Sequence, residues 1–194
     1  MKKNILVLGP SRAGKTTLTK KLNEELNYSV VCFDSIVHAF EQSFPQLGIC
    51  FGEGAVNTAT NLADFLAHYF NVLSHRAKEK NGVSFAAEGG YFDFDKILLA
   101  MKKYDILKEF LCIGLVYNNK TPDELFNDIR KNDTEGDWSN NCDDETLKKC
   151  VNIFTEDNKL MYDKFRKHDF IIYDVSNNRD QILDKIVSDI KHML

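Results

Sequence analysis

The chain has 194 residues and a formal net charge of −4, with 43% hydrophobic and 28% charged residues. These values are close to those of ordinary globular proteins and exclude a chain that is disordered throughout. The length suits one α/β domain and leaves little room for two, so we expect residues 1–194 to form a single domain. The acidic balance argues against a protein that coats nucleic acid, because such binding depends on clustered Lys and Arg.

Hydropathy and cysteine content indicate in which cellular compartment the protein works. No apolar run approaches the ~18 residues that span a bilayer, and the apolar run after Lys3 is too short for a secretory signal. The five cysteines form no C-x-x-C pair, so the sequence indicates neither a disulfide framework nor a zinc site. We therefore expect a cytoplasmic protein that does not bind membranes.

Short apolar runs alternate with helical patterns along the chain. The expected strands are residues 5–8, 29–33, 83–87, 110–117 and 170–173. The expected helices are residues 15–26, 61–80, 93–103, 145–167 and 179–194. This alternation predicts an α/β fold: a five-stranded parallel sheet with right-handed crossovers and helices on both faces. Ligands of such sheets bind at the carboxyl ends of the strands.

A motif directly after the first apolar run carries the clearest chemical signal. It matches the phosphate-binding loop pattern G-x-x-x-x-G-K-[ST] in full. The motif consists of Gly9, Pro10, Ser11, Arg12, Ala13, Gly14, Lys15 and Thr16. Strand, loop and helix together predict a cradle of backbone N–H groups around an anion, at the positive end of a helix dipole. The alternative is an ordinary glycine-bearing turn.

The residue types within this loop suggest individual roles. Lys15 is expected to reach the β- and γ-phosphates of a nucleotide, and the Thr16 hydroxyl to bind Mg²⁺. Thr17, the next residue, is expected to join the loop in contacting the phosphates. We expect Arg12 to be exposed at the mouth of the ligand crevice.

Two carboxylates follow predicted strands at the edge where the phosphate loop lies. Asp34 ends the second strand and suits a general base, which takes the proton of an attacking hydroxyl. The alternative for Asp34 is to cap the helix that follows. Glu88 ends the third strand and is expected to hold Mg²⁺ through water or to meet the substrate. A solvated carboxylate at the strand end is its alternative, and which of the two residues is the base stays open.

Two long excursions interrupt the alternation, at residues 35–60 and 131–144, and such segments are usually functional. The phosphate loop, Asp34, Glu88, the helix start at residues 121–125 and the turn at residues 174–179 together resemble the P-loop small-molecule kinases. That superfamily includes adenylate, gluconate, shikimate and nucleoside kinases. The order of these parts matches over nearly the whole chain, but only the phosphate loop is a specific motif.

The resemblance implies roles for the excursions and for two arginines. Residues of about 35–80 would bind the acceptor, and residues of about 120–145 would form a lid over ATP. Arg130 would arrive on the phosphates with the lid; its alternative is an exposed arginine paired with Asp123 or Asp133. Arg179 would stack on the adenine base, or else be an ordinary surface residue at a helix start. ATP and Mg²⁺ are the implied cofactors.

The expected reaction is transfer of the γ-phosphoryl group of Mg·ATP to a hydroxyl of a small metabolite, such as a nucleoside or a sugar. Between Asp34 and Lys80 the only arginine is Arg76, whereas a phosphate-bearing acceptor calls for several. A nucleotide monophosphate kinase and a non-kinase ATP-binding regulator or ATPase remain alternatives. The GTPase motifs D-x-x-G and N-K-x-D are missing at the required places. The expected partner is a small-molecule acceptor, without nucleic acid, and a homodimer stays open.

Overall fold

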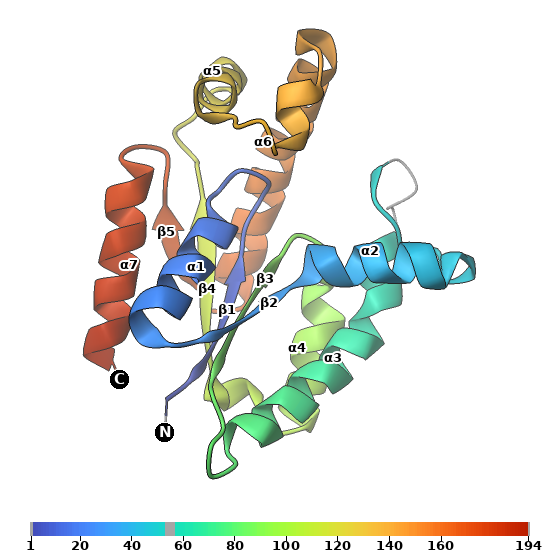
Figure 1. Ribbon diagram of the computed structural model, residues 1–194, viewed down its shortest axis with the longest axis vertical. Helices are drawn as coiled ribbons and strands as arrows, with labels where there is room; N and C mark the ends of the chain where they lie inside the picture. The colour runs from blue at the N-terminus through green and yellow to red at the C-terminus, as the bar shows by residue number, and fades with distance from the viewer. Residues whose placement is uncertain (1, 53–56, 194) are drawn as a thin grey trace.

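The computed structural model describes residues 2–52 and 57–193. A five-stranded sheet with the order β2-β3-β1-β4-β5 forms its centre, and every neighbouring pair of strands is parallel (Figure 1). The strands are β1 (Asn4–Leu8), β2 (Ser29–Cys32), β3 (Phe85–Gly89), β4 (Phe110–Val116) and β5 (Ile171–Asp174). The predicted parallel α/β fold is therefore confirmed.

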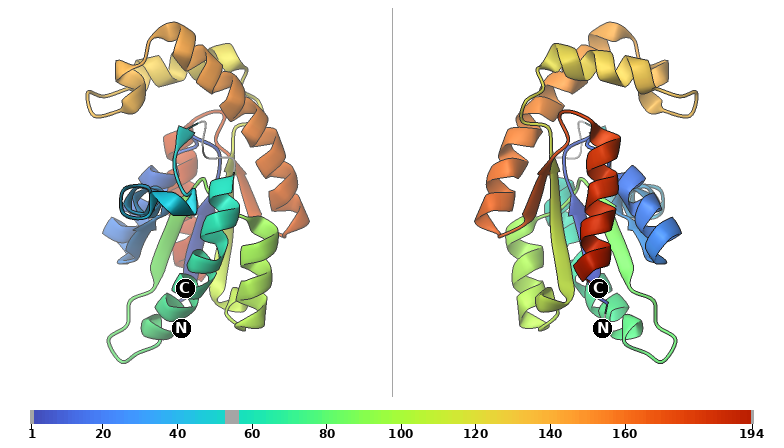
Figure 2. Two further views of the ribbon diagram at one scale, coloured as in Figure 1. Left: turned by 90° about the vertical axis from the view of Figure 1, so that its right-hand side faces the viewer. Right: turned by 90° about the vertical axis from the view of Figure 1, so that its left-hand side faces the viewer.

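Helices cover both faces of this sheet, as the side views in Figure 2 show. The helices are α1 (Lys15–Leu26), α2 (Phe33–Ser43), α3 (Thr58–Ala77), α4 (Phe94–Lys103), α5 (Pro122–Asn132), α6 (Asp144–Lys167) and α7 (Arg179–Met193). Short 3-10 turns are η1 (Pro45–Leu47), η3 (Leu107–Glu109) and η4 (Trp138–Asn141). Within the described part of the chain, no helix combines the length and the apolar character that crossing a membrane requires.

The central strand β1 joins two hydrophobic cores because its side chains alternate between the faces of the sheet. Leu6 and Leu8 pack into the core that contains residues of α3 and α4, whereas Ile5 and Val7 pack into the core that contains residues of α1 and α7. All four side chains are fully buried. A strand that is buried on both sides carries a continuous apolar run, which is why the sequence signal for β1 is clear.

Several predicted strand bounds are wrong by one or two residues. The second strand ends at Cys32, and Phe33 instead begins α2, where its ring packs 5.7 Å from that of Phe70. The third strand runs from Phe85 through Gly89, whereas Val83, the predicted start, is 44% exposed. An apolar residue that enters a buried helix is indistinguishable by pattern from one that continues a strand.

The two excursions contain helices of their own. The first holds α2, η1 and the start of α3; residues 53–56 of it lie outside the described part of the chain. The second contains the end of α5, η4 and the first residue of α6. Together α5, η4 and the start of α6 project as an arm above the carboxyl ends of the strands (Figure 2). We call residues 121–145 the lid, after the role that the resemblance implies for this part of the chain. The two long crossovers thus place extra structure at the edge where the phosphate loop lies.

Candidate active site

The loop between β1 and α1 has the backbone geometry of an anion cradle. Gly9 passes so close to β4 that an added Cβ would lie 2.6 Å from the carbonyl oxygen of Leu115. Gly14 has φ of 91°, a left-handed conformation that glycine adopts without strain. It directly precedes Lys15, the first residue of α1, so the loop delivers its N–H groups to the positive end of that helix.

Lys15 extends across the loop. Its Nζ atom donates a hydrogen bond to the carbonyl oxygen of Pro10 at 3.0 Å. Burial lowers the pKa of Lys15, and the negative charges of Glu88 and Asp34 partly oppose that shift. These charges favour the protonated ammonium, which is the form that binds a phosphate oxygen.

The residues expected to hold Mg²⁺ lie together. The Thr16 hydroxyl donates to Oε1 of Glu88 at 3.2 Å, and Glu88 is only 2% exposed. A hydroxyl and a buried carboxylate are oxygen ligands of the kind that Mg²⁺ prefers. Across residues 2–52 and 57–193 no group of three or more His, Cys, Asp or Glu residues could hold a metal. This donor set fits Mg²⁺ that takes most of its ligands from phosphates and water.

Asp34 occupies a different local structure from the one predicted. It does not end a strand but lies in the first turn of α2, which begins at Phe33. A carboxylate there interacts favourably with the helix dipole. Asp34 nevertheless lies close enough to Lys15 for its charge to raise the pKa of that lysine. The charge of Asp34 therefore acts both on the start of α2 and on Lys15 in the phosphate loop. Its action as a general base stays a prediction.

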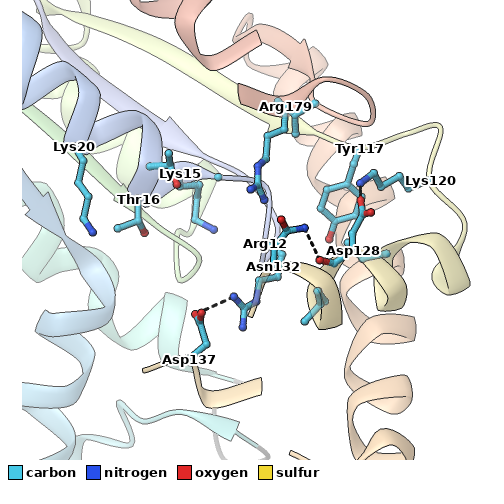
Figure 3. A pocket seen from close by; sticks show the side chains of 15 residues that line it. Arg12, Lys15, Thr16, Lys20, Tyr117, Lys120, Asp128, Asn132, Asp137 and Arg179 are labelled. Atoms are coloured by element: carbon cyan, nitrogen blue, oxygen red, sulfur yellow. Dashed lines mark hydrogen bonds and ion pairs between the residues drawn. The ribbon is translucent and has the colours of Figure 1, made fainter. Parts of the chain in front are cut away.

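A cavity of about 410 Å³ lies between the phosphate loop and the lid (Figure 3). Its side chains include two carboxylates, from Asp128 and Asp137. The cationic residues that line it are Arg12, Lys15, Lys20, Lys120 and Arg179. Five cations facing two carboxylates give the cavity a positive excess in a chain whose net charge is −4. Such a cavity attracts a polyanion.

A second cavity, of about 540 Å³, continues from the first around Arg179. Arg179 begins α7 beside the phosphate loop, where a Cβ on Gly14 would lie 3.3 Å from its Cδ atom. Lys120 also lines this cavity, and its pKa is lowered by burial and by the positive charge of Arg179. Arg179 thus lines both cavities, and its stacking on an adenine base stays a prediction.

Arg130 does not reach the phosphate cavity. Its guanidinium donates to Oδ1 of Asp144 at 2.7 Å and 3.0 Å and to the carbonyl oxygens of Ser139 and Cys142 at 2.7 Å and 2.6 Å. Arg130 also lies 3.9 Å from Asp133, the alternative partner expected for it. The expectation that Arg130 faces the phosphates is not met in this structure, because the guanidinium holds the lid together instead.

Arg12 was expected to be exposed, but it contacts the lid. It is not freely exposed at the crevice mouth but forms ion pairs with Asp133 at 3.2 Å and with Asp137 at 3.0 Å, both in the lid. Figure 3 shows Arg12 and Asp137 pointing toward one another. Sequence reasoning missed this contact, since residues 125 positions apart leave no local signal.

Two further basic residues of the cavity also escaped the sequence analysis. Lys20 lies one helical turn after Thr16 on α1, so the period of the helix could have placed it on the phosphate side. Lys120 follows β4 at the carboxyl edge of the sheet, where ligands of parallel sheets bind. Both signals were present in the sequence.

The chain is similar over its length to solved kinase structures. A shikimate kinase from Acinetobacter baumannii in complex with shikimate matches with a TM-score of 0.63 and 14% identity, covering 99% of this chain and 94% of that chain. A gluconokinase from Sinorhizobium meliloti 1021 matches with 0.59 and 12%, covering 98% and 93%. A shikimate kinase from Bacteroides thetaiotaomicron matches with 0.51 and 19%, covering 98% and 97%. No protein-family model and no curated protein matches the chain.

The chain has the fold of the P-loop small-molecule kinases. The resemblance that the phosphate loop and its neighbouring residues suggested is thereby confirmed for the fold. Identities of 12% to 19% do not carry residue roles from one chain to another, so the roles rest on the geometry described above.

Proposed function

We propose that the protein is a kinase that transfers the γ-phosphoryl group of ATP to a hydroxyl group of a small metabolite. The observation that carries this proposal is the positive cavity between the phosphate loop and the lid, in a chain that is negative overall. A triphosphate is a polyanion of the size and charge that such a cavity receives. The likeness of fold to shikimate kinase and gluconokinase supports the same reaction class.

The chain's own residues supply positioning and electrostatic stabilisation, the main contributions to phosphoryl transfer. The loop amides and Lys15 hold the phosphates and stabilise charge on the oxygens as the transferred group moves. Asp34, whose charge acts on Lys15, accepts the proton of the attacking hydroxyl. Thr16 and Glu88 would hold Mg²⁺, directly or through water, and the bound ion would supply positive charge that neutralises the phosphates.

The distribution of basic residues supports an acceptor without an anionic group. Residues 22–75, which include most of the proposed acceptor-binding excursion, contain no Lys or Arg. Arg76 lies in the last turn of α3, and Ser74 of the same turn contacts Asn4 at the opposite edge of the sheet. A phosphate or carboxylate acceptor would lack a cationic partner from this region. For that reason we do not propose shikimate, which bears a carboxylate, as the acceptor of this protein.

The second candidate is an ATP-binding regulator that signals through lid movement. The same cavity and lid support it, because nucleotide binding does not require an acceptor. The two functions differ in one measurable property: a kinase releases ADP in response to an added acceptor, whereas a regulator does not.

The first experiment tests the phosphate cradle. Lys15→Ala removes the cation that extends across the loop, so we expect Mg·ATP binding to weaken and turnover to fall by at least about 10²-fold. Calorimetry with Mg·ATP and an assay of ADP release measure the two effects. Lys21→Ala is the matched control, because Lys21 pairs with Asp184 on α7 instead of facing the cavity. Turnover by Lys15→Ala at the parent rate would contradict the proposal.

The second experiment identifies the acceptor. Nucleosides, sugars and amino alcohols are offered with Mg·ATP, each beside its phosphorylated or carboxylated counterpart. We expect ADP release only with uncharged or amine-bearing hydroxyl compounds. ADP release that no compound stimulates, in a protein that binds Mg·ATP, would favour the regulator instead.

A further inference from the structure

At the boundary between the phosphate loop and the lid, the loop supplies the positive charge and the lid supplies the negative charges, the reverse of the expected arrangement. The lid's arginine, Arg130, is occupied by Asp144 and by carbonyl groups of the lid itself. The guanidinium that crosses the boundary belongs instead to Arg12, in the phosphate loop. The lid contributes the carboxylates of Asp133 and Asp137 to this contact.

Arg12 contacts the lid through several groups at once. One guanidinium nitrogen donates to Oδ1 of Asp137 at 3.0 Å, and the other pairs with Oδ1 of Asp133 at 3.2 Å and hydrogen-bonds to the Ser139 hydroxyl. The guanidinium also lies 5.6 Å from the ring centre of Trp138. We call Arg12 together with Asp133, Asp137, Trp138 and Ser139 the loop–lid contact. Its side chains come from two segments more than a hundred residues apart.

Hydrogen bonds within the lid orient both carboxylates that pair with Arg12. The side chain of Asp133 is 3% exposed and accepts from the Ser139 hydroxyl at 2.6 Å. Oδ2 of Asp137 accepts from the backbone N–H and the hydroxyl of Thr134, both at 2.9 Å. The pKa of Asp137 is lowered, first by the backbone N–H of Thr134 and also by Arg12. The contact therefore joins a cation to carboxylates that hydrogen bonds within the lid already orient.

The backbone of Arg12 supports a specific use of its side chain. Its φ is 68°, in the left-handed region where side chains other than glycine are uncommon. A residue with a Cβ atom is strained in this conformation, and such strain concentrates at functional sites. Within the phosphate loop this position would suit glycine, whereas the guanidinium of arginine makes every contact described above.

We propose that Arg12 is a positioning residue that closes the lid over the phosphate cavity. The guanidinium comes from the loop and the carboxylates come from the lid, so the closed position is held by an ion-pair network whose cation is adjacent to the phosphate site. This inference rests on the proposed kinase function, because closure is needed there to exclude water and to complete the site. Arg12 acts through the lid, whereas Lys15 acts on the phosphates.

The chain provides its own reporter for the test. Trp138 is the only tryptophan, and it lies at the loop–lid contact, 52% exposed and edge-on to Phe154. Arg12→Gly removes the guanidinium and suits the local backbone. We expect acrylamide to quench Trp138 more strongly in this variant and lid amides of residues 133–142 to exchange at least about fivefold faster. Arg12→Lys, which keeps the charge but loses the paired geometry, should restore part of the protection.

Two further variants make the test specific. Lys21→Ala removes a positive charge from α1 without touching the lid and should leave both readouts at the parent values. Asp137→Asn should reproduce Arg12→Gly, and the double variant Arg12→Gly with Asp137→Asn should change little beyond either single one, since both remove the same contact. With Mg·ATP and an acceptor, Arg12→Gly should lower kcat more than it raises the Kd of Mg·ADP.

The readouts separate this inference from the kinase assignment. Quenching and exchange need neither an acceptor nor turnover. Parent-like quenching and exchange in Arg12→Gly would overturn the proposed role of Arg12, and so would fully additive effects of Arg12→Gly and Asp137→Asn. A protein that never releases ADP on addition of any acceptor would instead contradict the kinase assignment, with the loop–lid contact still measurable.

Discussion

Asp34 lies where a carboxylate can serve a helix and a reaction at the same time. It is in the first turn of α2, where a negative charge interacts favourably with the N–H groups of the helix start. It is also near enough to Lys15 to raise the pKa of that lysine. The two roles predict different consequences when the charge is removed, because a helix contribution affects stability and a base affects the chemical step.

Asp34→Asn separates these roles. If Asp34 accepts the proton of the attacking hydroxyl, kcat falls by about 10²- to 10⁴-fold while the Kd of Mg·ATP changes little. Steady-state kinetics with the identified acceptor, together with calorimetry, measure both quantities. Asp64→Asn, an exposed carboxylate on α3, is the control. A variant with parental kcat and a lower melting temperature would limit Asp34 to stabilising α2.

Residues of the site differ in how far the sequence can predict their positions. Thr16 and Glu88 each follow from a local pattern, a motif and a strand end, and the structure brings them within 3.2 Å. Arg12 was expected to be exposed and Arg130 to face the phosphates, but each forms ion pairs with carboxylates of the folded lid. A motif fixes where a backbone goes; a long charged side chain takes the partners that the tertiary structure offers it.

At the scale of elements, the lid depends on a well-defined helix start. The Thr121 hydroxyl accepts from the backbone N–H of Glu124 at 3.3 Å, and the Glu124 carboxylate accepts from the N–H of Thr121 at 2.8 Å. Pro122 occupies the first turn of α5, where no N–H donor is needed. This capping box anchors the end of the lid that adjoins β4.

Thr121→Ala is expected to loosen the lid selectively. Loss of the cap costs about 1 kcal/mol of helix stability, so amides of α5 should exchange about fivefold faster. Hydrogen exchange measured by mass spectrometry resolves α5 from the rest of the chain. Thr155→Ala removes a hydroxyl that donates to the carbonyl of Val151 within α6, and should leave α5 unchanged. Equal exchange of α5 in Thr121→Ala and the parent would show that tertiary contacts alone hold this helix.

Element boundaries also show where sequence patterns stop being informative. The start of α5 is correctly predicted, because Thr, Pro and Glu at fixed positions form a helix-start signature. The end of β2 is misplaced by one residue, because Phe33 is apolar and fully buried in α2 as it would be in a strand. Polar residues with specific hydrogen bonds mark boundaries, whereas apolar residues report only burial.

At the scale of the whole molecule, the sheet separates two hydrophobic cores and buries titratable groups in both. Cys112 of β4 packs against the core that contains α3 and α4, and Tyr28 belongs to the core that contains α1 and α7. Burial raises the pKa of Cys112 from 9.0 to about 12 and that of Tyr28 from 10.0 to about 12. The folded state thus keeps both groups protonated at pH values where the unfolded chain loses the protons.

This difference predicts loss of stability in alkali. Well below pH 9 both groups are protonated in the folded and the unfolded state, so they do not make the free energy of unfolding depend on pH. As the pH rises toward 12, the unfolded chain releases these protons before the folded protein does. Each group then lowers the free energy of unfolding by up to about 1.4 kcal/mol per pH unit. Urea unfolding followed by circular dichroism between pH 8 and 11.5 measures the slope. Cys112→Ala should flatten it from pH 9 upward, whereas Tyr28→Phe should act only above pH 10. A parent protein with constant stability over this range would show that neither group is shielded from water by the sheet and its helices.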